Sequence, residues 1–275
     1  MAQTSRTREP WPLSYPDDWE THVQELTGPV LLDVAGYVTP VDLRAEQVRC
    51  VLLPLLAHVR ERREANPAGR LMVGLAGVPG GGKSTFAALL AWVARRVWPA
   101  GGLVVLGMDG WHWPNAVLDR RTIVDLQGRR VPLRRRKGGP ESFDVDALAN
   151  ALQRLKAGED LRLPVYDRRL HDPRPEALCV GSEAGVVLVE GNYLLSPQPP
   201  WVRLLALWDL RLFLECDLDR AATQIMGRHM KGGSSEQEAR DKYESNDRLN
   251  MVAVAATEPQ AELTVQWFPA PRLRA

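Results

Sequence analysis

Short apolar runs alternate with segments of helical period along this chain. The runs are brief, continuous and bounded by turn residues, which is typical of buried strands; they lie at 71–76, 103–107, 185–191, 210–216 and 262–267. Between them, apolar residues recur at helical spacing, at 43–64, 86–93, 144–155, 217–229 and 234–256. This alternation predicts a three-layer α/β fold with a mainly parallel central sheet and the 71–76 strand at its centre.

A glycine-rich loop joins the first of these strands to the helix after it. Residues 77–85 fit the phosphate-loop pattern G-x-x-x-x-G-K-[ST] at every fixed position. Glycines allow the chain to turn with its N–H groups inward, where they form a cradle for phosphate with the positive end of the helix. A glycine turn that binds nothing is the alternative, but both flanks match the motif. The glycines are Gly77, Gly80, Gly81 and Gly82.

The last three residues of the loop complete this P-loop pattern. Lys83 can reach the β- and γ-phosphates of a nucleotide, and the Ser84 hydroxyl is suited to ligate Mg²⁺. Thr85 supports the start of the helix. We therefore predict a P-loop NTPase fold that uses ATP and Mg²⁺.

Two acidic residues stand at the ends of predicted strands, where ligands bind in open parallel sheets. Asp109 follows the 103–107 strand and could orient and deprotonate an acceptor hydroxyl. Glu190 ends the 185–191 strand in the position of a Walker-B residue and is expected to act on Mg²⁺, directly or through water. The alternative for both is a polar residue that only caps a turn.

Composition narrows the function classes. The formal net charge is +1 over 275 residues, so no global field favours nucleic acid or a membrane surface. No apolar run could span a bilayer, and the first ten residues lack the apolar core of a signal peptide. Cys50, Cys179 and Cys216 lie far apart without zinc spacing, which indicates buried thiols in a reducing compartment. We expect a cytoplasmic protein with neither a membrane nor a nucleic acid as partner.

Several stretches together resemble a known family. The glycine loop and the MDGWHWPN run at 108–115 are similar to the uridine kinase, phosphoribulokinase and pantothenate kinase family of P-loop kinases, in particular to a bacterial branch described as nucleoside or fructose kinase-like. The resemblance covers roughly residues 70 to 267. Further matching pieces follow in order at 136–144, 165–173, 187–195, 228–233 and 245–247.

The resemblance implies functional residues. In this family a glutamate at the Walker-B position is the usual pattern, which fits Glu190. A helical lid at about 225–235 would close over the γ-phosphate, exclude water and bring Arg228 to the transferring group. Asp109, Lys83 and Arg228 would then be catalytic. Residues expected to contact the acceptor are Asp109, His112, Arg136, Lys137, Tyr166, Arg168, His171 and Asn246.

A dense basic run lies between residues 129 and 137. It could bind nucleic acid, but it lacks interleaved aromatic residues and the whole chain is near neutral. A loop whose last members, Arg136 and Lys137, face an anionic or hydroxyl-rich substrate fits better. A solvated basic loop is the remaining interpretation.

The chain divides into three parts by pattern. Residues 1–40 form an N-terminal extension with Trp11, Tyr15 and Trp19, expected to pack onto the main domain as a surface arm, with a substrate mouth or a homodimer contact as alternatives. Residues 41–267 form the kinase domain. Residues 268–275 form a proline-rich tail that we predict to be disordered.

The predicted reaction is transfer of the ATP γ-phosphoryl group to a hydroxyl of a small molecule. A sugar or a nucleoside is favoured as acceptor over pantothenate. An NTP-driven switch or chaperone would use the same cradle but would need neither the MDGWHWPN run nor a lid. An RNA-binding NTPase built on the arginine run would show salt-sensitive RNA binding.

Overall fold

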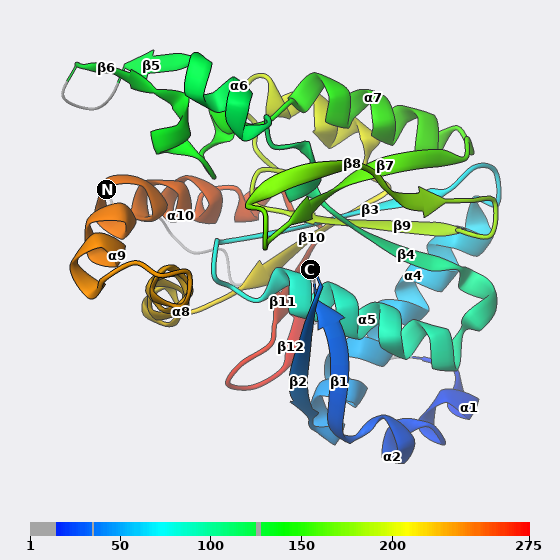
Figure 1. Cartoon of the computed structure of the whole chain (residues 1–275). Coiled ribbons are helices and arrows are strands. Elements are labelled where there is room, and N and C mark those ends of the chain that lie inside the picture. Colours follow the sequence, from blue (N-terminus) through cyan, green and yellow to red (C-terminus); the bar gives the residue numbers. More distant parts are fainter. Residues whose placement is uncertain (1–14, 35, 125–127) are drawn as a thin grey trace.

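The computed structural model describes residues 15–34, 36–124 and 128–275. Its centre is a six-stranded sheet in the order β12-β11-β10-β3-β9-β4, in which only β12 is antiparallel to its neighbour (Figure 1). This confirms the α/β fold with a mainly parallel sheet and an interior strand before the glycine loop. The strands are β3 (Leu71–Gly77), β4 (Leu103–Gly107), β9 (Val186–Gly191), β10 (Leu210–Glu215), β11 (Leu263–Gln266) and β12 (Arg272–Arg274).

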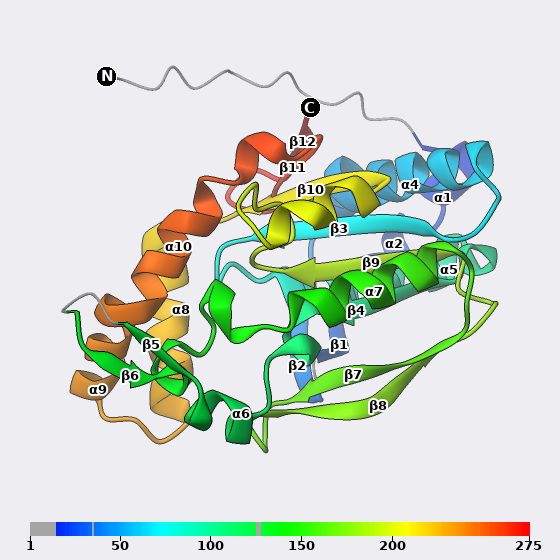
Figure 2. The same cartoon turned by 90° about the horizontal axis from the view of Figure 1, so that it is seen from above.

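Helices cover both faces of the sheet (Figure 2). Successive side chains of a strand point to opposite faces. Leu71, Val73 and Leu75 accordingly pack with α4 and α5, whereas Met72 packs with α7 and α10 on the other face. The helices in chain order are α3 (Ala45–Gln47), α4 (Leu53–Ala65), α5 (Lys83–Val97), α6 (Asn115–Arg120), α7 (Val145–Lys156), α8 (Leu218–Lys231), α9 (Glu236–Lys242) and α10 (Arg248–Ala255).

The N-terminal extension is part of the main hydrophobic core. Helices α1 (Asp17–Glu20) and α2 (Val23–Leu26) bury Trp19 and Leu26 against α4, as expected for an arm that covers the domain. A hairpin of β1 (Gly28–Val34) and β2 (Tyr37–Leu43) follows and packs on α5. Residue 40 lies inside β2, so the extension has no structural boundary there. Trp11 lies outside the described residues.

Some predicted boundaries differ from the structure. The 43–64 pattern stays helical through Pro54: α3, a π-turn at Val48–Leu52 and α4 follow one another without a break, and the proline is the second residue of α4, directly after the π-turn, where the helical hydrogen-bond register changes. The segment predicted as one helix at 234–256 is α9 and α10 joined by a π-turn at Tyr243–Asp247. A hairpin of β7 (Leu161–Asp167) and β8 (Asp172–Val180) was not predicted, nor was the short pair β5 (Thr122–Val124) and β6 (Arg130–Pro132).

Two predictions were wrong. The tail is not disordered, because β12 pairs with β11 and its Leu273 is buried in the core. The cysteines are not all buried: Cys179 is exposed, and Cys50 and Cys216 are only partly covered. Among the described helices, none combines the length and the apolar character needed to cross a bilayer.

Arg70, directly before β3, links its own segment to the end of α7 and to the loop before β9. Its side chain is 4% exposed and donates to the carbonyls of Ala184, Leu155, Glu159 and Gly181, and to the Asp160 carboxylate. These partners belong to the end of α7 and to the loop before β9. The guanidinium therefore satisfies several carbonyl groups that no regular secondary structure pairs.

Replacing Arg70 with methionine should destabilise the fold by about 3–5 kcal/mol, because the change leaves buried carbonyls unpaired. Urea unfolding would measure the change. Arg203→Met is the matched control: this arginine pairs with Asp146 at the surface and is 51% exposed, so we expect a loss of at most about 1 kcal/mol. Equal losses for both variants would contradict the role assigned to Arg70.

Candidate active site

The glycine loop folds tightly between β3 and α5 and packs against α8. Gly80 has φ +76°, and a Cβ there would lie 2.5 Å from the carbonyl oxygen of Ala221 in α8. Gly82 precedes α5 with φ +90°. The N–H of Gly81 donates to the carbonyl of Val78 within the loop, so this amide is already paired. The loop thus has its predicted place at the start of a helix, in close contact with α8.

Lys83 is buried at the base of this loop. Its side chain is 7% exposed, and its ammonium donates to the carbonyl of Val78 at 3.0 Å and to Oδ1 of Asn192 at 2.8 Å. Burial lowers the pKa of Lys83 to about 8, against the opposing effect of the nearby Glu190 and Asp109 carboxylates. The loop holds the lysine through its own carbonyl, and a nucleotide phosphate could take over this interaction.

Ser84 and Glu190 meet at the end of the sheet. The Ser84 hydroxyl donates to Oε1 of Glu190 at 2.9 Å. Burial raises the pKa of Glu190, while Lys83 opposes the shift. A hydroxyl and a carboxylate are hard oxygen ligands of the kind Mg²⁺ prefers, and Mg²⁺ takes its other ligands from phosphates and water. These two side chains therefore fit a metal that is held jointly with a nucleotide.

Asp109 lies in the turn after β4, beside β9. Its carboxylate remains 43% exposed and faces the same cavity as Ser84 and Glu190. It is close enough to influence the ionisation of Lys83, Glu190 and Tyr166. The carboxylate and the glycine loop therefore lie at one site, as the sequence predicted.

His112 and Tyr166 lie beside Asp109, with their ring centres 5.2 Å apart. His112 is buried, and the centre of its ring lies 3.9 Å from the centre of the Phe143 ring. Its Nδ1 donates to the carbonyl oxygen of Asp109 at 2.9 Å, since a carbonyl can only accept. Burial lowers the pKa of His112, which keeps the imidazole neutral near pH 7. Burial and the Asp109 charge raise the pKa of Tyr166 to about 12, so its hydroxyl remains a hydrogen-bond donor.

Lys137 lies beside Tyr166. Its ammonium lies 5.1 Å from the centre of the Tyr166 ring and donates to Oδ1 of Asn115 and to the carbonyl of His171. Burial and the neighbouring Arg134 lower its pKa to about 8. His171 has φ +51° and an exposed ring, and the contact it makes to Lys137 is through the backbone. A role for its imidazole stays a prediction.

Arg136 and Asn246 connect the loop that contains Lys137 to the π-turn at Tyr243–Asp247. Arg136 donates to Oδ1 of Asn246 at 2.7 Å and to the Glu141 carboxylate at 3.0 Å. Asn246 is 2% exposed and donates to the carbonyl of Lys137. Both side chains are thus engaged within the protein. They position Lys137, and direct contact with an acceptor remains a prediction for each.

Two arginines approach the site from opposite sides. Arg168 comes from the β7–β8 hairpin and lines the cavity of Asp109. Arg228 comes from α8 and lies within electrostatic range of Arg168, Asp109 and Glu190. The next residue of α8, His229, is bonded through Nε2 to Oδ2 of Asp247 at 2.7 Å, which ties α8 to the π-turn before α10. Arg228 therefore extends from a helix that contacts both the glycine loop and this turn.

Sequence reasoning did not assign roles to Asn192 and Asn115, although both lie in stretches that carried the resemblance. Asn192 follows β9 and holds Lys83, and Asn115 begins α6 and holds Lys137. For Asn192 the available signal was its position directly after the end of β9, where ligands bind in parallel sheets; Asn115, at the start of α6, has no such position.

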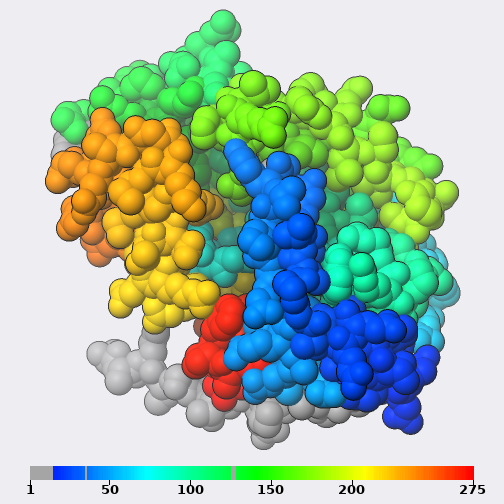
Figure 3. All heavy atoms as spheres, turned by 60° about the horizontal axis from the view of Figure 1, so that its bottom comes forward, coloured from blue at the N-terminus to red at the C-terminus, as the bar shows by residue number. Residues whose placement is uncertain are grey.

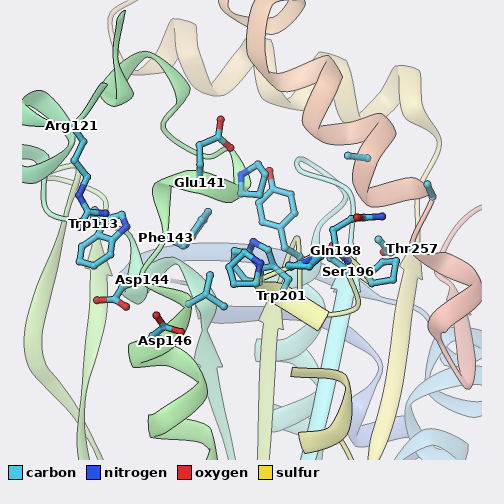
Figure 4. A pocket seen from close by; sticks show the side chains of 18 residues that line it. Trp113, Arg121, Glu141, Phe143, Asp144, Asp146, Ser196, Gln198, Trp201 and Thr257 are labelled. Atoms are coloured by element: carbon cyan, nitrogen blue, oxygen red, sulfur yellow. The ribbon is translucent and has the colours of Figure 1, made fainter. Parts of the chain in front are cut away.

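Two cavities lie near this site. One of about 540 Å³ contains Ser84, Asp109 and Glu190. The other, of about 650 Å³, lies behind Phe143 and Tyr193 and is lined by Trp113, Trp201 and neighbouring residues (Figure 4). Because Ser84, Asp109 and Glu190 line the smaller cavity and none of them lines the larger one, the smaller cavity is the candidate site for chemistry.

Replacing Gly80 with alanine should weaken ATP binding at least about tenfold, because the added Cβ would clash with α8 and strain a left-handed backbone. ATP titration followed by calorimetry would measure the effect. Gly227→Ala is the control, since a Cβ at this helical position meets nothing within 4 Å and should leave binding unchanged. Wild-type affinity in the Gly80 variant would show that the loop tolerates a side chain.

Comparisons with known proteins agree with this geometry. The profile of the Phosphoribulokinase / Uridine kinase family matches residues 72–271. Uncharacterized protein YggC of Escherichia coli is 32% identical over 235 residues, 86% of this chain and 94% of that protein. A putative uridine kinase of Schizosaccharomyces pombe is 30% identical, with 72% and 83% of the two chains covered.

A solved structure is similar as well. The crystal structure of a putative fructose transport system kinase from Silicibacter sp. has a TM-score of 0.68 and 33% identity, over 76% of this chain and 96% of that one. The fold and the P-loop kinase resemblance predicted from the sequence are thereby confirmed. The chain belongs to the phosphoribulokinase and uridine kinase family of P-loop kinases.

Proposed function

We propose that this protein transfers the γ-phosphoryl group of ATP to a hydroxyl group of a sugar or a nucleoside. The observation that carries the proposal is the position of the Asp109 carboxylate, which shares one cavity with the P-loop serine and Glu190. A carboxylate in this place can orient an acceptor hydroxyl and accept its proton, the role that an aspartate has in kinase phosphoryl transfer.

In the proposed reaction the acceptor oxygen forms a bond to the γ-phosphorus, and the bond from that phosphorus to the β–γ bridging oxygen breaks. ADP leaves, and the hydroxyl proton passes to Asp109. Lys83 and the loop amides hold the phosphates, and Arg228 stabilises the charge of the transferring group. His112, Lys137 and Tyr166 orient the acceptor.

Ser84 and Glu190 would hold Mg²⁺, which when bound neutralises charge on the β- and γ-phosphates. Their contribution is positional: a hydroxyl at the start of α5 and a carboxylate at the end of β9 already lie in contact. Arg228 lies on a helix whose neighbours include the glycine loop, so movement of α8 could close the site over the phosphate and exclude water.

An acceptor screen tests the proposal. Formation of ADP and of a phosphorylated product would be measured with ATP, Mg²⁺ and D-fructose, D-ribose, uridine, cytidine or pantothenate. ADP formation that depends on one sugar or nucleoside supports the proposal. ATP hydrolysis that no acceptor stimulates would overturn it and favour a switch or chaperone. Transfer to pantothenate alone would contradict the sugar or nucleoside assignment.

A further inference from the structure

The cavity lined by Ser84, Asp109 and Glu190 continues well past these three residues. From Ser84 it follows one face of α5, where Ala88, Trp92 and Arg95 also line it. Arg95 is eleven residues after Ser84, so at about 1.5 Å per residue the cavity extends about 16 Å from the proposed metal ligand. This is longer than a single sugar ring requires.

The N-terminal hairpin forms a wall of this extension. Residues 31–34 of β1 line the cavity, and Leu178 and Val165 of the β7–β8 hairpin line it too. Figure 3 shows the β1–β2 hairpin in blue reaching toward the green atoms of β7–β8. Two hairpins that are more than a hundred residues apart in the sequence therefore bound one space.

The chemistry of the cavity changes along its length. Near β4 and β9 it presents the charged groups Asp109, Glu190 and Arg168. Further along α5 the lining includes the apolar residues Ala88, Trp92, Val34 and Leu178, together with two charged residues, Asp33 and Arg95. Apolar surface that remains open to solvent beside a reaction site favours an apolar group of the substrate.

We propose that this extension is a distal acceptor subsite, in which β1 and α5 bind an apolar group remote from the hydroxyl that is phosphorylated. The inference rests on the proposed kinase function and deepens it. The substrate class is a hydroxyl compound that carries an apolar extension, larger than a free monosaccharide. The N-terminal hairpin is then a determinant of specificity, since it contributes a wall but none of the groups assigned to the chemistry.

Matched pairs of acceptors test this. Each pair shares the reacting hydroxyl and differs in the remote group: methyl and hexyl β-D-glucoside, methyl and hexyl β-D-fructofuranoside, methyl and hexyl β-D-ribofuranoside, glycerol and 1-O-hexylglycerol. We expect the longer member of at least one reactive pair to have a kcat/KM about tenfold or more above that of the shorter one. Equal values within every reactive pair would overturn the subsite.

Variants then locate the subsite. Ala88→Phe should fill the extension, and Val34→Asp should place a charge in its wall, so the ratio of kcat/KM for the long and short acceptors should fall toward one. Any general loss of activity cancels in this ratio. Two variants on different elements guard against one that fails to fold.

Val38→Asp is the control. Val38 lies on β2, is 74% exposed and pairs across the hairpin with Asp33, but it does not line the cavity. Its ratio should equal that of the wild type. If Ala88→Phe and Val34→Asp also keep the wild-type ratio, the subsite is excluded while the kinase function stands. If the screen finds an acceptor but no longer member of any pair is phosphorylated, the subsite is excluded as well. If neither the screen nor any pair yields a phosphorylated product, the proposed function fails and this inference fails with it.

Discussion

Replacing Asp109 with asparagine should lower kcat about 1,000-fold and leave ATP binding near that of the wild type. The amide keeps the shape of the side chain but cannot accept the hydroxyl proton, and positioned general bases contribute factors of this order. The carboxylate is 43% exposed and is not needed to hold the glycine loop. Steady-state kinetics with the acceptor found in the screen, together with ATP calorimetry, would separate the two effects.

Asp119→Asn is the matched control. This aspartate lies on α6, is 60% exposed and pairs with Arg134 at the surface, so its loss should leave kcat within about a factor of two. Wild-type turnover in the Asp109 variant would remove this carboxylate from the mechanism. A parallel loss of ATP affinity would indicate instead that Asp109 helps to hold the nucleotide.

The groups that could be predicted from the sequence are those fixed by local chain geometry. β3 and β9 read as strands because both faces are buried, so their apolar runs are continuous. Lys83, Ser84 and Glu190 then follow from their places at the ends of these strands. Asp109 could be placed for the same reason, since carboxyl ends of parallel strands meet at one edge of the sheet.

The features that were missed depend on contacts between distant segments. The tail reads as a polar, proline-rich end, and only pairing with β11 makes it a strand. The β7–β8 hairpin is half exposed, and its pattern is interrupted by Pro164 and by a register shift between Leu163 and Val165. The cavity wall formed by β1 consists of residues more than forty positions before the glycine loop, and no local pattern carries that information.

Replacing Lys83 with methionine should reduce kcat/KM at least about 1,000-fold and, unlike the Asp109 change, should also weaken ATP binding. Methionine has a similar length and fits the buried space, but it brings no charge to the β- and γ-phosphates. Removing one preorganised group that stabilises transition-state charge costs a factor of 100 to about 1,000 in other enzymes, and here ground-state binding is lost as well.

The structure explains why this position should not tolerate a neutral residue. The lysine is 7% exposed and its burial is already unfavourable for the charge, so the Asn192 and Val78 contacts exist to keep an ammonium ready for phosphate. Lys242→Met, an exposed change on α9, is the control and should leave both parameters unchanged. Undiminished ATP binding in the Lys83 variant would place the nucleotide elsewhere. Weak ATP binding here together with normal ATP binding in the Asp109 variant would assign phosphate binding to one side of the cavity and acceptor activation to the other.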